Sequence, residues 1–189
     1  MNIFKNWREP MSALTHLIAL LFIFPITIFL MYLGYKEGGT HYLLSFFIFG
    51  ISICLLYLAS TIYHMLPVKD NIIKILKKID HMMIFVLIAG TYTPVCLISL
   101  NNKFGYSILS LVWVIAIFGI ILKFFWINAP RWFSTSIYVI MGWLSVFAFF
   151  PLIRAIELNG ILLLLLGGII YTIGAVIYAT KYPKISIKF

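Results

Sequence analysis

Charged side chains are scarce in this 189-residue chain. Only 10% of its residues are Asp, Glu, Lys or Arg, and only five of these are acidic. Hydrophobic residues make up 63% of the chain, and the mean hydropathy is +1.10. A soluble domain of this size could not bury so much apolar surface. The composition therefore excludes an ordinary soluble domain and indicates an integral membrane protein.

Cysteines, signal peptides and linkers are equally scarce. Cys54 and Cys96 lie in separate apolar runs, which argues against a disulfide framework or a CxxC metal site. No cleavable signal peptide is visible, because the first apolar run is too long for one. No soluble domain, low-complexity tract or convincing repeat interrupts the chain, so the usual signature of an inverted-repeat transporter is missing. Residues 1–189 are therefore predicted to form a single transmembrane domain.

Six charge-free apolar runs are present instead, each long enough to cross a bilayer as a helix of about 18 residues or more. They lack the alternation that is typical of transmembrane strands. The sequence therefore predicts an all-α integral membrane protein with an interfacial segment at residues 1–10 and six transmembrane helices. These helices are expected at residues 11–35, 41–65, 80–100, 104–125, 133–153 and 159–180.

The basic residues are distributed unevenly between the two predicted sides of the membrane. Of the 14 Lys and Arg residues, Lys36, Lys103 and Arg154 fall on one side and the other 11 on the opposite side. Because basic loops remain cytoplasmic, the chain is predicted to be N-in and C-in. Residues 70–79 form an amphipathic, lysine-rich linker suited to a membrane surface. The formal charge of +9 favours anionic lipid as a partner, and no nucleic-acid motif is present.

Polar residues lie at the facing ends of two neighbouring apolar runs. Ser60 and His64 are four residues apart and share a helix face, and Asp80 opens the next run on the same side of the membrane. His16 and His81 are expected near the same side. Ionisable groups inside a membrane are costly and usually functional. At this shallow depth a second interpretation stays open, in which these groups are solvated or paired with lysines.

These residue types suit a metal or acid–base site. Neutral histidine is a common metal ligand, and a catalytic zinc takes three protein ligands and one water. A carboxylate such as Asp80 can act as a general base, and a hydroxyl such as Ser60 can orient the water or the substrate oxyanion. One His, one Ser and one Asp do not by themselves make a zinc site.

Several motifs in order along the chain add to this pattern. They are Arg8-Glu-Pro-Met-Ser-Ala-Leu-Thr-His16, Ser60-Thr-Ile-Tyr-His64, Asp80-His81, Ile88-Ala-Gly-Thr-Tyr-Thr-Pro94, Gly142-Trp143 and Gly167-Gly-Ile-Ile-Tyr-Thr-Ile-Gly174. Together they resemble the haemolysin-III family, the bacterial branch of the progestin and adipoQ receptor superfamily. The resemblance covers essentially the whole chain.

The resemblance implies a seven-helix, N-in protein of the bacterial cytoplasmic membrane, with zinc near the cytoplasmic face. It assigns His64 as a zinc ligand, Ser60 as a site hydroxyl and Asp80 as the carboxylate beside the zinc-bound water. His81 matches the bacterial motif without being a family-wide ligand, and His16 is a candidate for lining the site. The implied activity is zinc-dependent hydrolysis of lipid amide bonds. The alternatives are a cytolysin or pore former and a non-catalytic receptor or membrane-homeostasis protein.

The chain departs from the family at one point. The resemblance implies two further zinc ligands from a His-x-x-x-His motif on a seventh helix, but no histidine follows His81. The chain is then either a fragment of a longer protein, which we favour, or a short member without the standard site. In both cases we expect weak zinc binding and impaired activity. The sequence identifies membrane lipids as partners and leaves the substrate and the oligomeric state open.

Overall fold

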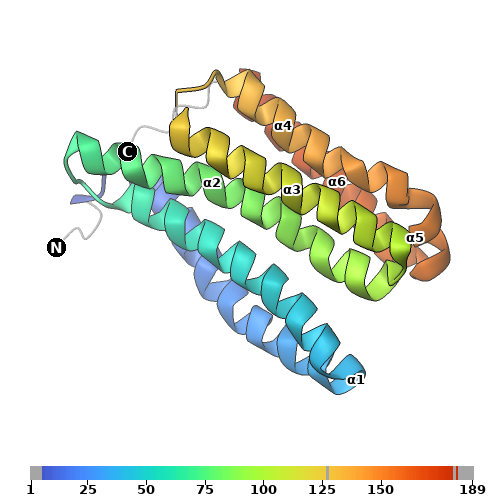
Figure 1. Cartoon of the computed structure of the whole chain (residues 1–189). Helices are drawn as coiled ribbons and strands as arrows, with labels where there is room; N and C mark the ends of the chain where they lie inside the picture. The colour runs from blue at the N-terminus through green and yellow to red at the C-terminus, as the bar shows by residue number, and fades with distance from the viewer. Residues whose placement is uncertain (1–5, 127, 181, 183–189) are drawn as a thin grey trace. The chain divides into compact units, whose positions relative to one another are not determined.

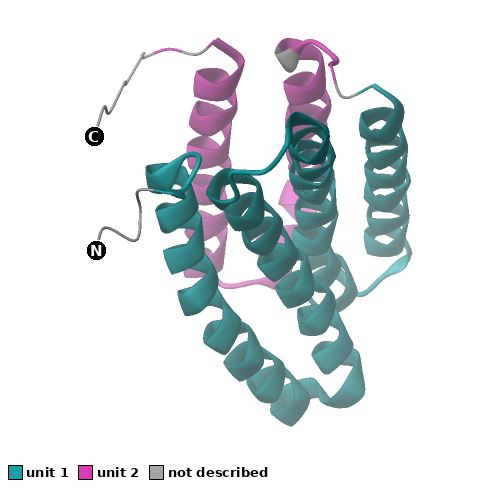
Figure 2. Ribbon diagram, turned by 90° about the vertical axis from the view of Figure 1, so that its left-hand side faces the viewer, with its two compact units in different colours: residues 1–127 teal, residues 128–189 magenta. Residues whose placement is uncertain are grey.

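The computed structural model describes residues 6–126, 128–180 and 182 (Figure 1). All regular secondary structure in these residues is helical. The chain divides into two compact units, Met1–Ile127 and Asn128–Phe189 (Figure 2). Five helical stretches are long and apolar enough to cross a membrane. They are Pro10–Met65, Asp70–Leu100, Lys103–Phe125, Trp132–Ala155 and Leu158–Thr180.

Helix α1 spans Pro10–Met65 and turns back on itself at Gly39 (Figure 1, where the turn lies at the label). Gly39 has φ 63° and ψ −149°, a conformation that favours glycine because it has no Cβ. The backbone N–H of Glu9 donates to the carbonyl of His64 at 3.0 Å, which joins the two ends of the helix. Helix α1 therefore consists of two antiparallel limbs, and the predicted connector between the first two helices is reduced to a turn at one glycine.

Small residues let these two limbs approach closely. Gly34 lies against the ring of Phe46, and Gly50 lies against the side chain of Thr27. A Cβ at either glycine would collide with its neighbour. Close backbone approach through small residues is the usual way in which apolar helices gain van der Waals contact inside a membrane.

Helix α2 (Asp70–Pro94) begins ten residues before the predicted start of the third transmembrane helix. It continues as a π-helix, η2 (Val95–Leu100). The predicted surface linker at residues 70–79 is helical, but it is continuous with the membrane helix instead of separate from it. No glycine or proline lies between Asp70 and Gly90, so nothing in the sequence ends the helix there.

Helix α2 contacts α1 on one side and α3 (Lys103–Phe125) on the other. Gly90 lies against Ser52 of α1, and Phe85 lies against Gly119 of α3. Phe85 is fully buried, so it fills the space that the glycine leaves. The helix α3 matches the predicted helix 104–125 within one residue.

Pro94 produces a different local structure from the one its sequence context predicts. The sequence predicts a kink whose free acceptor, the Gly90 carbonyl, is satisfied by Thr91 or Thr93. Instead, Thr91 donates to the carbonyl of Ile88 at 2.7 Å and Thr93 to that of Ala89 at 3.1 Å. The helix accommodates the missing N–H of proline by widening into η2.

The second unit consists of α4 (Arg131–Trp143), the 3₁₀-helix η3 (Leu144–Ala148), α5 (Phe149–Ala155) and α6 (Leu158–Thr180). The predicted continuous helix 133–153 is therefore interrupted at η3. Ser145 contributes to this interruption, because its hydroxyl donates to the carbonyl of Gly142 at 2.8 Å and competes with the regular ladder. Helix α6 matches the predicted helix 159–180 within one residue.

Helices α4 and α6 pack together within this unit, where the Tyr171 hydroxyl donates to the carbonyl of Tyr138 at 2.7 Å. The sequence predicts close helix approach at Gly167, Gly168 and Gly174. Among the described residues, however, a Cβ added at any of these glycines would meet no atom within 4 Å. The contact on α6 is made by a tyrosine and not by the glycines.

The predicted interfacial segment at residues 1–10 is only partly described. Residues 1–5 lie outside the described residues. Asn6 has 3₁₀ conformation and residues 7–9 are irregular, so residues 6–9 are not α-helical. The helix begins at Pro10, which suits the first helical position because its missing N–H is not needed there.

Large apolar side chains point outward from helices of both units. Phe22 is 68% exposed, Phe125 80%, Phe147 71% and Leu163 68%. Water-soluble proteins rarely present apolar surface on this scale. Surfaces of this kind match the hydrocarbon interior of a bilayer.

The contact between Gly90 and Ser52 gives a test of the α1–α2 packing. Gly90→Ala should lower the free energy of unfolding by about 1–3 kcal/mol, because the added methyl group overlaps the Ser52 side chain. Gly167→Ala, at an open position, should leave stability equal or slightly higher. Thermal unfolding of both variants in detergent would measure this difference. Equal unfolding temperatures would contradict the packing.

Candidate functional site

The polar residues of the first unit gather where α1 begins and ends. Glu9 directly precedes α1, and Ser60 and His64 lie in its last turns. Asp80 lies on α2, less than one turn after the end of the lysine-rich stretch. The reversal at Gly39 is what brings the start and the end of α1 to the same place.

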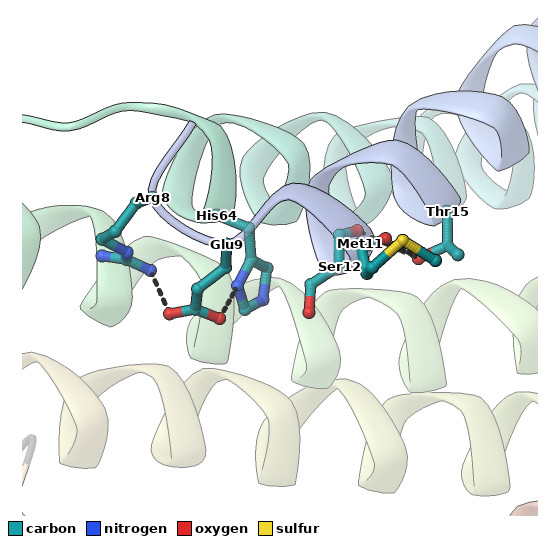
Figure 3. Close-up of polar contacts among 6 residues, drawn as sticks. All are labelled: Arg8, Glu9, Met11, Ser12, Thr15 and His64. Carbon is teal, nitrogen blue, oxygen red and sulfur yellow. Dashed lines mark hydrogen bonds and ion pairs between the residues drawn. The ribbon is translucent and has the colours of Figure 1, made fainter. Parts of the chain in front are cut away.

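His64 is held by an ion-pair chain with Glu9 and Arg8 (Figure 3). Nδ1 of His64 lies 2.7 Å from one Glu9 carboxylate oxygen, and the Arg8 guanidinium lies 3.0 Å from the other. The guanidinium also lies over the ring of Tyr63, 4.1 Å from its centroid. Because an ionised carboxylate only accepts hydrogen bonds, Nδ1 of His64 donates and Nε2 is left for another partner.

Asp80 is the buried carboxylate of the cluster, with 9% of its surface exposed. The Ser60 hydroxyl lies within hydrogen-bonding reach of this carboxylate. His64, His16 and Arg8 are the ionisable groups close enough to act on it. The structure thus brings Ser60, His64 and Asp80 together at one end of the first unit.

The other histidines are placed differently. The ring of His16 lies 5.6 Å from that of His64 and 5.8 Å from that of Tyr57, and its buried Nδ1 has no hydrogen-bond partner among the described residues. His81 is half-buried beside Asp80 on α2. His41 lies at the opposite end of the unit, where a ring nitrogen is 3.0 Å from the carbonyl of Leu97.

The donor set does not fit a three-ligand zinc site. Within the described residues, no group of three or more His, Cys, Asp or Glu side chains is arranged to hold a metal ion. One ring nitrogen of His64 is already bound to Glu9, which leaves its other nitrogen as one donor. Zinc in a catalytic site takes three protein ligands, so these residues alone do not supply the set.

What the cluster offers without a metal is proton transfer and hydrogen bonding. Asp80 can accept a proton, the Ser60 hydroxyl can donate to a carbonyl or a water, and His64 is fixed in one orientation by Glu9.

Comparison with models of known protein families gives a match over nearly the whole chain. A family model described as "Haemolysin-III related" matches residues 4–188. The chain belongs to the haemolysin-III family.

Two curated haemolysin-III relatives are similar over most of this chain. "Hemolysin-3 homolog" of Bacillus subtilis (strain 168) is 41% identical over 174 residues, which cover 92% of this chain and 81% of the relative. "Hemolysin-3" of Bacillus cereus is 39% identical over 171 residues, which cover 90% of this chain and 78% of the relative. No solved structure is significantly similar to the chain. The apolar helices together with this family membership identify a membrane protein.

Arg8 and Glu9 belong to the cluster, although the sequence of this haemolysin-III member did not by itself indicate them as site residues. Their placement depends on the turn at Gly39, which is more than 25 residues away in sequence and returns His64 to the start of α1. One signal was available: Glu9 is among only five acidic residues and stands directly before the first apolar run.

The contact between Glu9 and His64 yields a stability prediction. Glu9→Ala should lower the free energy of unfolding by about 1 kcal/mol, a modest value because the Glu9 side chain is 46% exposed. Glu37→Ala removes an exposed acid at the opposite end of the same limb and should have no measurable effect. Thermal unfolding in one detergent would compare them, and an equal loss in both variants would argue against the ion-pair chain.

Proposed function

We propose that this haemolysin-III member is a six-span protein of the bacterial cytoplasmic membrane, N-in and C-in, whose polar cluster acts on membrane lipid. The two limbs of α1 each become one span in this topology, and the four other apolar stretches complete the six. The observation that carries the proposal is the convergence of Ser60, His64 and Asp80 in an otherwise apolar unit. Ionisable groups in membrane helices are functional candidates because placing them there is costly.

The arrangement of charges in the first unit supports this topology. At the end that carries the cluster, the Arg8 backbone N–H donates to Met65, and Nζ of Lys78 donates to the carbonyl of Phe124 at 2.9 Å. Arg8 beside the two ends of α1 and Lys78 of α2 beside the end of α3 therefore share one side of the unit. The opposite end carries His41 and the start of α3 at Lys103. The positive-inside rule assigns the more basic side to the cytoplasm.

Cysteine labelling in cells tests the orientation. In a variant without Cys54 and Cys96, Lys77→Cys should resist a membrane-impermeant thiol reagent, whereas Glu37→Cys should react with it. Both positions are outside the fully buried core, so access depends mainly on the side of the membrane. Strong external labelling at position 77 with none at position 37 would reverse the proposed topology.

The proposed chemistry at the cluster is hydrolysis of a lipid amide bond. Asp80 would accept the proton of the attacking water and return it to the amine that leaves when the C–N bond breaks, and the Ser60 hydroxyl would donate a hydrogen bond to the water or to the substrate carbonyl. His64, held by Glu9, would be a metal ligand. In the haemolysin-III family pattern the chemistry that a bound zinc would supply is activation of the attacking water, but the described residues do not complete its ligand set. We therefore propose that the activity is impaired in this chain.

Metal analysis tests this part of the proposal. The purified chain should retain much less than one equivalent of zinc after mild chelation, because three strong ligands are needed for tight binding. Any zinc that remains should be lost in His64→Ala. It should be kept in His41→Ala, because the His41 ring lies at the opposite end of the unit. Stoichiometric zinc in the chelated wild-type chain would show that the ligands have been misassigned.

A second candidate function is membrane lysis. The names of both relatives contain the word hemolysin, and this supports a membrane-active role. Dye release from liposomes at low protein-to-lipid ratio would establish membrane lysis as the function and argue against the proposed lipid-amide hydrolysis. A non-catalytic receptor or membrane-homeostasis role predicts neither dye release nor zinc.

A further inference from the structure

A buried lysine lies at the cytoplasmic end proposed for the first unit, outside the polar cluster. Lys123 is only 3% exposed, although it is in the last turn of α3. It continues the buried stripe of α3 that packs on α2, where Gly119 meets the ring of Phe85. The buried residues along this stripe are Gly105, Ile108, Val112, Ala116, Gly119 and Lys123.

No acidic residue neutralises Lys123. The charged group that acts on it is Lys77 of α2, which carries the same sign. Of the five acids in the chain, Glu9 is paired with Arg8 and His64, and Asp80 lies in the polar cluster. The other three are distributed as follows: Glu37 is near the opposite end of the unit, Asp70 is at the first position of α2, and Glu157 is in the second unit.

The helix end does not fully provide the missing negative charge. A cation in the last turn of a helix interacts favourably with the free carbonyl groups. One of these, the carbonyl of Phe124, already accepts a hydrogen bond from Nζ of Lys78 at 2.9 Å. Lys78 thus occupies that acceptor. Lys77 and Lys78 of α2 and the buried Lys123 of α3 therefore place positive charge at this end of the two packed helices.

Exposed aromatic side chains mark the depth of these lysines. Phe124, Phe125 and Trp126 follow Lys123 directly, and all three are exposed. Aromatic residues, tryptophan above all, favour the level of the lipid headgroups. An anion that reaches a lysine pair at this depth is more readily supplied by a lipid headgroup than by a soluble ion.

We propose that Lys77 and Lys123 form a binding site between α2 and α3 for the phosphate group of an anionic membrane lipid. The ammonium groups would bind the phosphate oxygens by charge-assisted hydrogen bonds, which are stronger than neutral ones. The exposed rings of Phe124 and Phe125 would lie beside the lipid headgroup. This site is separate from the Ser60–His64–Asp80 cluster and does not depend on its chemistry.

The test measures lipid-dependent thermal stabilisation of the full chain in a neutral detergent. Phosphatidylglycerol, phosphatidylcholine and inorganic phosphate are the three probes. Lys123→Met and Lys77→Gln should each weaken phosphatidylglycerol binding about tenfold or more, because each removes one charged contact. Lys74→Gln, which removes an equal charge from an exposed position on the same helix, should bind as the wild type does.

The lipid-free samples separate binding from folding. Lys123→Met should be at least as stable as the wild type without lipid, because methionine keeps a side chain of similar length and removes the charge of a residue that is 3% exposed. If this variant fails to fold, Lys77→Gln decides, since Lys77 is only partly buried. Equal phosphatidylglycerol affinity in Lys77→Gln and Lys74→Gln would overturn the site. Equal stabilisation by inorganic phosphate would overturn its assignment to a lipid.

Discussion

The joint between the two ends of α1 positions the rest of the first unit. The Glu9 N–H binds the His64 carbonyl, and the Glu9 carboxylate binds the His64 ring, so backbone and side chain close the same contact. The closed limbs then offer one apolar surface to α2, which in turn brings Asp80 toward Ser60. Because the Glu9 side chain is 46% exposed, this contact contributes more to the placement of the limbs than to the free energy of unfolding.

Two regions at this end of the first unit, one around His64 and one around Lys123, differ in their balance of positive and negative charge. Around His64, one carboxylate from Glu9 and one from Asp80 accompany the cation of Arg8. Around Lys123, positive charge accumulates without a carboxylate. The chain has only five acidic residues, and none of them acts on Lys123. The first region is therefore suited to internal proton chemistry and the second to an anion from outside the chain.

The long apolar helices were predictable from the sequence, because runs without charge have few alternatives to helices in a membrane. The limits of α3 and α6 agree with the prediction within one residue for the same reason. The interruption at η3 was not predictable, since it depends on local hydrogen bonds. The continuity of residues 70–79 with α2 had a sequence signal, because no glycine or proline stands between Asp70 and Gly90 to end the helix. For the site, spacing identified Ser60 with His64, and the charge in the next run identified Asp80. Glu9 and Lys123 required the tertiary structure.

The one-glycine turn at Gly39 also bears on how the chain enters the membrane. In the proposed topology the only charged side chains between the two limbs are Lys36 and Glu37, which have opposite sign. Moving a charge through hydrocarbon is the main obstacle to translocating a loop. The tip of this hairpin is short and carries no net charge, so the hairpin can insert into the membrane as one helical unit. Its biogenesis would then need no separate transport of a hydrophilic loop, and the paired limbs would be in place before α2 is synthesised.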